Sequence, residues 1–218
     1  MALSFFDLFS IGIGPSSSHT TGPMRAARRV LDDLDAAGGL DRVWRVRVDL
    51  YGSLGSTGRG HHSDRAVLLG LLGHRPETVD PAAVGPEVDR ILARHRLSLL
   101  NRHPIHFRPN RDLILHQRKS LPQHPNGMRV RCYSRDRERI ADRVLFSVGG
   151  GFVVDAADLA GPTSANGVVE PYPYATGAQL LEHCASTGRS IAEVVLANET
   201  AQRSRDAVDE GVLAIWQV

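Results

Sequence analysis

Residues 44–51 alternate between apolar and polar side chains, and this period of two constrains the fold more than any other feature of the sequence. Such alternation is typical of a β-strand with one face on a hydrophobic core and one polar face. A glycine-rich loop at 52–60 and the apolar helical stretch Ala66–Leu72 follow the strand. The sequence therefore predicts a strand, a loop and a helix start in succession. The apolar positions of the strand are Trp44, Val46, Val48 and Leu50.

The rest of the chain up to residue 156 continues this mixture of helices and strands. Gly22-Pro23 and apolar positions of helical period predict a helix over about 24–37. A second helix is expected around Val88–Leu100, after a turn at Glu77–Pro81. Short strands are predicted at 105–107, 113–115, 128–133 and 143–147, and the three glycines at 149–151 favour a bulge. The predicted fold class is α+β, with helices packed on one face of a mixed or antiparallel sheet.

The composition changes after residue 156. Residues 157–176 are rich in Gly, Pro, Ser, Thr and Asn, which is typical of a linker. From 177 to 218 the apolar positions return to helical spacing, but nothing after them completes a helical domain. We therefore expect an α+β domain over 1–156, a linker at 157–176, and the first helices of an incomplete all-α domain at 177–218. Uncovered apolar positions on those helices predict self-association.

Several classes of protein are excluded by composition. Cys132 and Cys184 are the only cysteines, so the chain has no disulfide framework and no cysteine set for a zinc or iron–sulfur site. Lys119, the only lysine, lies in a polar, basic stretch, which argues against a pyridoxal-phosphate Schiff base. No apolar run reaches the roughly 18 to 20 residues that span a bilayer, and the N-terminal segment lacks a basic region. We therefore expect a cytoplasmic protein without a membrane partner.

The densest group of reactive side chains lies just before the first predicted helix. Ser16, Ser17, Ser18, His19 and Thr20 supply four hydroxyls and an imidazole in five residues. The free N–H groups and the dipole of a helix N-terminus favour an anion, so this segment could hold a carboxylate or a phosphate. A simple helix cap would need only one hydroxyl, which favours a functional interpretation over a structural one.

A second group of reactive side chains precedes the helical stretch that begins near residue 63. It contains His61 and His62, followed by Ser63 and Asp64. Adjacent histidines point in different directions, so one can face a site while the other packs or is solvated. Histidine is suited to proton transfer near neutral pH. A solvated pair beside a capping Ser63 or Asp64 is equally compatible with the motif alone, which lacks the i, i+4 spacing of a helical two-histidine metal site.

Residues 101–146 carry 11 basic and four acidic side chains, a regional charge of +7. Such a segment could contact the phosphates of a nucleic acid. Only Phe107, Tyr133 and Phe146 are aromatic there, and no nucleic-acid-binding motif is present. A solvated sheet face or a subunit interface is therefore favoured, and no nucleic-acid partner is expected.

Together these motifs resemble the single-chain bacterial iron–sulfur L-serine dehydratases (L-serine ammonia-lyases). The resemblance covers essentially the whole chain in order, and the SSSHT and GHHSD segments are its most specific parts. The segments that carry it are FFDLFSIGIGPSSSHTTGPMRAA at 5–27, YGSLGSTGRGHHSDRAVLLGL at 51–71, LPQHPNGM at 121–128, FSVGGGFVVD at 146–155 and PYPY at 171–174.

The resemblance implies a carbon–oxygen lyase that converts L-serine to pyruvate and ammonia without pyridoxal phosphate, in amino-acid degradation and gluconeogenesis. In that family a small α+β domain, similar to a ligand-binding domain of some phosphoglycerate dehydrogenases, packs on a larger helical domain. A 4Fe–4S cluster in the helical domain acts as the Lewis acid on the substrate hydroxyl. By resemblance His61 is the expected catalytic base, with His62 as the alternative. Ser16, Ser17, Ser18, His19 and Thr20 are expected to bind the substrate carboxylate or line the cleft.

The resemblance also implies what this chain lacks. Family members continue for roughly another domain, and their cluster ligands lie in that part, so no residue here is assigned as a metal ligand. We expect the chain to be inactive without a cluster-bearing C-terminal domain or partner chain, and a homodimer is also compatible with the sequence. The alternative is a non-catalytic regulatory domain that binds an amino-acid carboxylate through the same hydroxyl segment.

Overall fold

The computed structural model describes residues 4–9, 11–160 and 169–218. The chain divides into two compact units, an α+β unit of Gly12–Ala160 and a helical unit of Met1–Ile11 together with Gly161–Val218. The N-terminal residues thus group with the C-terminal helices rather than with the α+β unit. Of the expected linker at 157–176, residues 161–168 lie outside the described residues, and its first residues belong to helix α7 (Ala156–Ala160). Within the described ranges, no helix is both long enough and apolar enough to cross a membrane.

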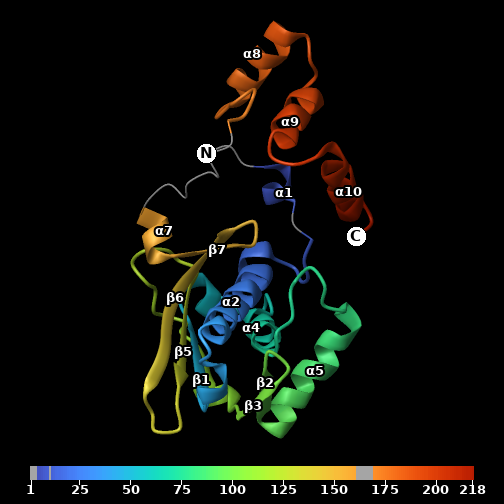
Figure 1. Ribbon diagram of the computed structural model, residues 1–218. Coiled ribbons are helices and arrows are strands. Elements are labelled where there is room, and N and C mark those ends of the chain that lie inside the picture. Colours follow the sequence, from blue (N-terminus) through green and yellow to red (C-terminus); the bar gives the residue numbers. More distant parts are fainter. Residues whose placement is uncertain (1–3, 10, 161–168) are drawn as a thin grey trace. The chain divides into compact units, whose positions relative to one another are not determined.

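A five-stranded sheet forms the centre of the α+β unit (Figure 1). Strand β1 pairs in parallel with β4, and the other neighbouring pairs are antiparallel. The sheet is therefore mixed, and the predicted α+β class is confirmed. The register shifts between Ser147 and Gly149, where the sequence predicted a bulge. In the order β4-β1-β5-β6-β7 the strands are Leu113–Leu115, Arg45–Leu50, Gly127–Tyr133, Arg139–Gly149 and Phe152–Asp155.

Two helices, α2 (Gly22–Ala36) and α4 (Ser63–Leu72), supply the helical side of the core. Helix α2 packs on β5, β6 and β7, and α4 packs alongside α2. The apolar side chains of β1, Val46, Val48 and Leu50, are fully buried in this core. Trp44 departs from the predicted pattern, because it precedes the strand and half of its surface is exposed.

Helices α2 and α4 approach each other closely at Gly70. A Cβ atom at this position would overlap the backbone carbonyl oxygen of Met24 on α2 and press on the Ala27 side chain. Backbone atoms cannot move aside as a flexible side chain can, so only glycine allows this helix separation.

Gly70→Ala is expected to lower the free energy of unfolding by about 1–3 kcal/mol, because it overpacks the contact between α2 and α4. Gly85→Ala is the matched control, since Gly85 also lies in a helix but a Cβ there meets no atom within 4 Å. Gly85→Ala should leave the free energy of unfolding unchanged or raise it by up to about 1 kcal/mol, because alanine favours the helix more than glycine does. Urea unfolding of both variants checks the difference, and equal effects would contradict close packing at Gly70.

The helix predicted around Val88–Leu100 is partly wrong. Helix α5 spans Pro81–Arg94 and ends where His95 adopts a left-handed backbone conformation (φ 52°). Residues 96–99 form strand β2 (Arg96–Leu99), which pairs antiparallel with β3 (His103–His106). Leu97 and Leu99 are buried while Arg96 is exposed, so these residues follow the period of two of a strand and not the spacing of a helix.

Short elements connect this framework. Helix α3 (Gly52–Ser56) follows β1, and helix α6 (Pro109–Asp112) precedes β4. A five-residue π-helical turn over Ser17–Thr21 leads into α2, and a 3₁₀ turn at Leu40–Arg42 precedes β1. The expected turn at Glu77–Pro81 is followed at once by α5, whose N-cap side chain is Asp80.

The helical unit contains α1 (Phe5–Leu8), α8 (Gly177–Thr187), α9 (Ile191–Thr200) and α10 (Arg205–Trp216). The buried carboxylate of Glu199 accepts hydrogen bonds from the Ser4 hydroxyl (2.9 Å) and the Phe5 backbone N–H (2.5 Å). The predicted C-terminal helices are therefore confirmed. Several apolar side chains on them are exposed, as expected: Leu181, Ile191, Val212, Leu213 and Trp216.

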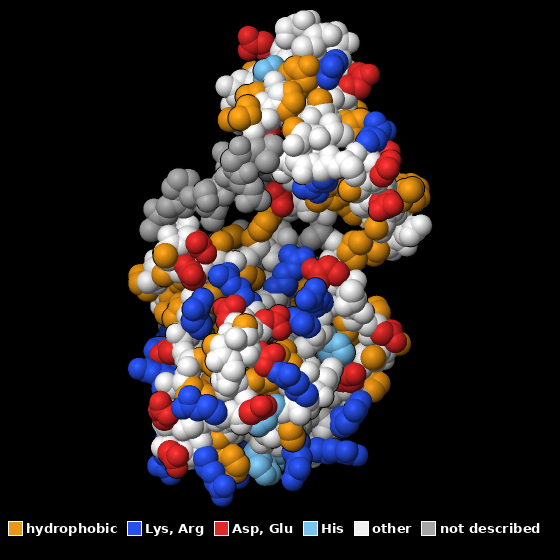
Figure 2. Space-filling view, viewed as in Figure 1, with side chains coloured by type: hydrophobic (Ala, Val, Ile, Leu, Met, Phe, Trp, Pro, Cys, Tyr) orange, Lys and Arg blue, Asp and Glu red, His pale blue; other side chains and the backbone are white. Residues whose placement is uncertain are grey.

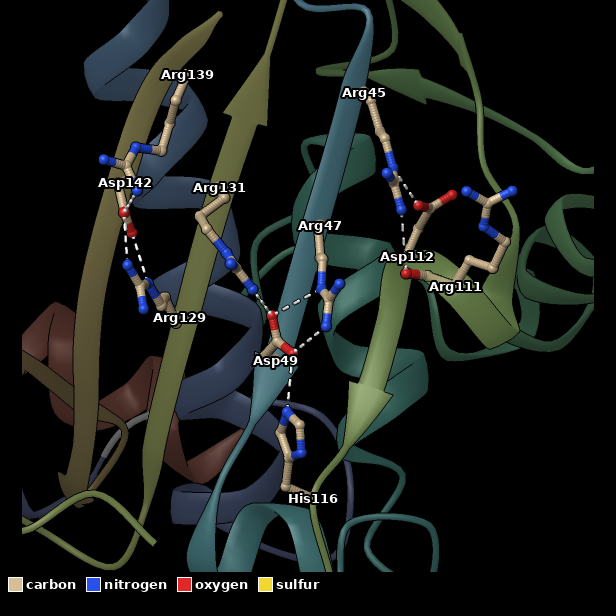
Figure 3. Close-up of polar contacts among 10 residues, drawn as sticks. All are labelled: Arg45, Arg47, Asp49, Arg111, Asp112, His116, Arg129, Arg131, Arg139 and Asp142. Atoms are coloured by element: carbon tan, nitrogen blue, oxygen red, sulfur yellow. Dashed lines mark hydrogen bonds and ion pairs between the residues drawn. The ribbon is translucent and has the colours of Figure 1, made fainter. Parts of the chain in front are cut away.

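Acidic and basic side chains are interspersed over the visible surface of the α+β unit (Figure 2). On the sheet face away from α2 they form ordered groups (Figure 3). Asp49 on β1 is almost fully buried and accepts hydrogen bonds from Arg47, Arg131 and His116. Burial opposes ionisation of Asp49, but these three donors outweigh it and hold the pKa of the carboxyl below its ordinary value.

Asp49→Asn is expected to lower the free energy of unfolding by about 3–5 kcal/mol at pH 7, because it leaves two arginines beside an uncharged side chain. The depressed pKa means that the carboxylate stabilises the fold above the unfolded-state pKa of about 4, and that this contribution is lost as the pH falls through the folded-state pKa. The difference in the free energy of unfolding between the wild type and Asp49→Asn should therefore become smaller in acid. Urea unfolding at pH 7 and pH 3.5 tests this.

Asp209→Asn serves as the control, because the Asp209–Arg205 pair is exposed and within one helix. Asp209→Asn should lower the free energy of unfolding by less than about 0.5 kcal/mol at either pH. A cost for Asp49→Asn no larger than that of Asp209→Asn would show that the buried carboxylate does not hold the sheet face together.

Candidate functional site

The structure brings the two histidine-containing segments together at the N-termini of α2 and α4. Thr20 Oγ1 donates a hydrogen bond to the backbone oxygen of His61 (2.9 Å). In return, Ser63 Oγ donates to the backbone oxygen of His19 (2.6 Å). Both hydroxyl residues are buried. Each segment therefore holds the backbone of the other, and residues more than 40 positions apart in the sequence form one site.

Hydroxyl groups hold the His19 ring on both sides. Its Nδ1 lies 2.9 Å from Ser18 Oγ, and its Nε2 lies 2.9 Å from Ser53 Oγ. Ser16 caps the turn, since its Oγ accepts a hydrogen bond from the backbone N–H of His19 (3.3 Å). His19 thus has a fixed ring orientation within the site.

His61 lies against His19, with 4.9 Å between the ring centroids. Its Nδ1 lies 3.1 Å from the backbone oxygen of Thr57. A carbonyl oxygen can only accept, so Nδ1 carries the proton in this contact. In the neutral ring, Nε2 then keeps its lone pair, and it has no hydrogen-bond partner among the residues described here. The His61 ring can therefore accept a proton through Nε2.

Burial is the main cause that lowers the pKa of His19 below its ordinary value, and the neighbouring His61 adds to it, against a hydrogen bond at Ser53 that raises it. His19 is therefore neutral at pH 7. A neutral neighbour is what a proton-accepting His61 requires, because a second positive ring at this distance would oppose its protonation.

His62 differs from His61 in its surroundings. It is exposed, adopts a left-handed backbone conformation (φ 58°), and immediately precedes α4. Its side chain makes no hydrogen bond to any described residue. Of the two expected histidines, His61 is the one whose ring lies in the group formed with His19.

The predicted hydroxyl residues have different positions. Ser16 and Ser18 are half-buried beside His19, and their Oγ atoms lie 3.4 Å apart. Ser17 is exposed, and its side chain has no hydrogen-bond partner in the described part of the chain. Thr20 is buried and bonded to the His61 backbone, as described above. Ser16, Ser17 and Ser18 are therefore more accessible to solvent than Thr20.

Sequence reasoning missed Ser53, which bonds to His19 Nε2. The residue lies in α3, immediately after β1, where the chain turns at Gly52 with φ 55°. The only available signal was the glycine-rich loop that follows the alternating strand. A glycine-rich loop does not by itself indicate which of its hydroxyls faces the histidine.

Within the described residues, no group of three or more His, Cys, Asp or Glu side chains could hold a metal ion. Cys132 lies in the core of the sheet, where burial raises the pKa of its thiol to about 12. Cys184 lies in α8, in the other unit. These donors do not fit an iron–sulfur cluster, which needs several thiolates close together.

Comparison with known proteins identifies the family. Residues 4–158 match the family model described as serine dehydratase beta chain. The chain is 49% identical over 220 residues to an L-serine dehydratase of Streptomyces coelicolor, with all of this chain and 48% of that protein covered. It is 42% identical to L-serine dehydratase 1 of Escherichia coli and 40% identical to an L-serine dehydratase of Mycobacterium tuberculosis, with 99% and 100% of this chain and 47% of each relative covered.

The chain thus spans about half the length of these relatives. The part that matches includes both the SSSHT and the GHHSD segments, which the structure joins into one site. This chain belongs to the serine dehydratase beta chain family.

Proposed function

We propose that this chain supplies the proton-accepting part of an L-serine dehydratase that converts L-serine to pyruvate and ammonia. The observation that carries the proposal is the His61 ring, whose Nδ1 is engaged by a backbone carbonyl and whose Nε2 is left to accept a proton. Family membership supports L-serine as the substrate, since the named relatives are L-serine dehydratases. The proposed base is His61 rather than the exposed His62.

In this proposal His61 removes the Cα proton of L-serine. Its Nε2 takes the proton, and the positive charge that develops on the ring is tolerated because His19 is neutral. The hydroxyls of Ser16, Ser17 and Ser18 would bind the substrate carboxylate beside the N-terminal turn of α2, where backbone N–H groups also favour an anion. The hydrogen bonds of Thr20 and Ser63 to the backbone of the opposite segment hold the two segments together. Loss of the β-hydroxyl as hydroxide leaves an enamine, which tautomerises to an imine. Addition of water to the imine then releases ammonia and leaves pyruvate.

The resemblance implies a 4Fe–4S cluster as the Lewis acid for the leaving hydroxide. The described donors of this chain do not fit such a cluster, as shown above, so its ligands would lie in a C-terminal domain or a partner chain. In this proposal the chain alone makes no pyruvate.

The proposal is tested by combining this chain anaerobically with iron, sulfide and a polypeptide that carries the remaining half of the Streptomyces coelicolor relative, and measuring pyruvate release from L-serine. His61→Ala should lower kcat by about 10²–10⁴-fold, which is the usual contribution of a general base. His62→Ala, the matched control one residue away, should change kcat less than about threefold. Added imidazole should partly restore the His61→Ala variant.

Loss of activity in His62→Ala with an active His61→Ala would contradict the assignment of the base. If the combined preparation made no pyruvate while this chain still bound L-serine, the regulatory carboxylate-binding domain would replace the catalytic proposal. Binding of L-serine to the chain is measured by calorimetry in the same buffer.

A further inference from the structure

A cavity lies at the opposite end of β1 from Ser53. It has a volume of about 300 Å³ and is lined by Trp44, Arg45, His106, Arg108, Arg111 and Asp112. We call it the Arg108–Arg111 pocket. Arg45 is the first residue of β1, whereas Ser53 lies in α3, three residues beyond the end of the strand. A six-residue strand is roughly 20 Å long. The pocket shares no residue with the histidine site.

Asp112 organises this pocket but leaves it with an excess of positive charge. The buried carboxylate accepts a hydrogen bond from Arg45 Nε (2.6 Å) through one oxygen and from the Arg108 backbone N–H (2.7 Å) through the other. Its charge is therefore matched by Arg45. The side chains of Arg108 and Arg111 have no carboxylate partner among the described residues, and the Arg111 guanidinium carries no dashed line in Figure 3. Two positive charges in the pocket remain unmatched.

The two unmatched guanidinium groups come from one short stretch of chain. Arg108 precedes α6, and the Arg111 backbone N–H bonds to the Arg108 oxygen (2.9 Å). Arg108 is the N-cap residue of α6 and has an extended backbone, and Arg111 lies within this four-residue helix. Both line the same pocket, so they can converge on one compact anion. An extended dicarboxylate would need its charges spread further apart.

The remaining wall is aromatic. Trp44 is 51% exposed. The Arg135 guanidinium lies over its ring, 5.4 Å from the centroid. The exposed His106 completes the lining. A ligand can thus place an organic group against the indole while its anionic group faces the two arginines.

We propose that the Arg108–Arg111 pocket binds a phosphate monoester of a small organic molecule, with the phosphate dianion held by Arg108 and Arg111 and the organic part against Trp44. The planar guanidinium fork matches the geometry of phosphate oxygens, and the two surplus positive charges match its two negative charges. This site is independent of the proposed lyase chemistry, so its failure and that of the His61 proposal are separate results.

The test uses the fluorescence of Trp44 in the 218-residue chain. The sequence has two tryptophans, so Trp216→Phe leaves Trp44 as the only tryptophan, which is excited selectively at the red edge of its absorption. Phenyl phosphate should cause a saturable change in emission, and inorganic phosphate should compete with it. Succinate, a dicarboxylate, and benzoate, a monoanion with the same ring, should bind at least tenfold more weakly than phenyl phosphate.

Arg108→Gln and Arg111→Gln should each weaken phenyl phosphate binding at least tenfold, which corresponds to one lost charge-assisted hydrogen bond. Both side chains are exposed, so neither substitution threatens the fold. Arg118→Gln is the matched control: it removes the same charge from an exposed arginine that has no carboxylate partner in the described chain and does not line the pocket. It should leave the affinity unchanged.

Three results would overturn the proposal. One is the absence of a saturable response to phenyl phosphate. Another is an equal loss of affinity for phenyl phosphate in Arg108→Gln and Arg118→Gln, which would indicate that the basic segment as a whole attracts the anion. The third is tighter binding of a thymidine dodecamer than of phenyl phosphate with the same dependence on Arg108, because a nucleic-acid backbone would then be the source of the phosphate.

Discussion

Two reciprocal hydrogen bonds hold the histidine site together, and the rest of its geometry depends on them. Thr20 bonds to the backbone of His61, and Ser63 bonds to the backbone of His19. They can form only because α2 and α4 begin side by side, which the close approach at Gly70 allows. The packing of two helices therefore sets the 4.9 Å separation of the two imidazole rings.

The sheet serves two purposes on its two faces. The face toward α2 is an apolar core that fixes where the helices start, while the opposite face carries paired arginines and aspartates (Figure 3). The Asp49 carboxylate on β1 can be almost fully buried because hydrogen bonds from three side chains replace its lost hydrogen bonds to water. The same strand begins at the Arg108–Arg111 pocket, with Arg45, and leads into α3, which contains Ser53. Strand β1 thus connects this pocket to the histidine site.

Local sequence patterns predicted the framework of the fold but not its contacts. The alternation at 44–51 predicted β1, and Gly22-Pro23 with helical spacing predicted α2, because each pattern reflects burial along a single element. The strand at 96–99 was missed because four residues show too little of a period of two beside a helix end. Trp44 was placed in the core by the same alternation, yet it lies before the strand and is half exposed.

The site was predictable in part. The clustering of hydroxyls at 16–20 and of histidines at 61–62 identified both segments, and the structure joins them. Their contact could not be derived from either motif, because it depends on the packing of α2 against α4. Ser53 has no distinctive sequence signal. The surplus charge of Arg108 and Arg111 depends on the ion pair between Asp112 and Arg45, a long-range contact that sequence spacing does not reveal.

The proposed role of His61 requires an Nε2 without a proton, beside a neutral His19 ring. Nitrogen-15 NMR of the histidine rings measures this, because protonated and unprotonated ring nitrogens have widely separated chemical shifts. At pH 7.5 in the 218-residue chain, we expect neutral His61 to carry its proton on Nδ1 and His19 to be neutral. A His61 ring protonated on Nε2, with a free Nδ1, would contradict it.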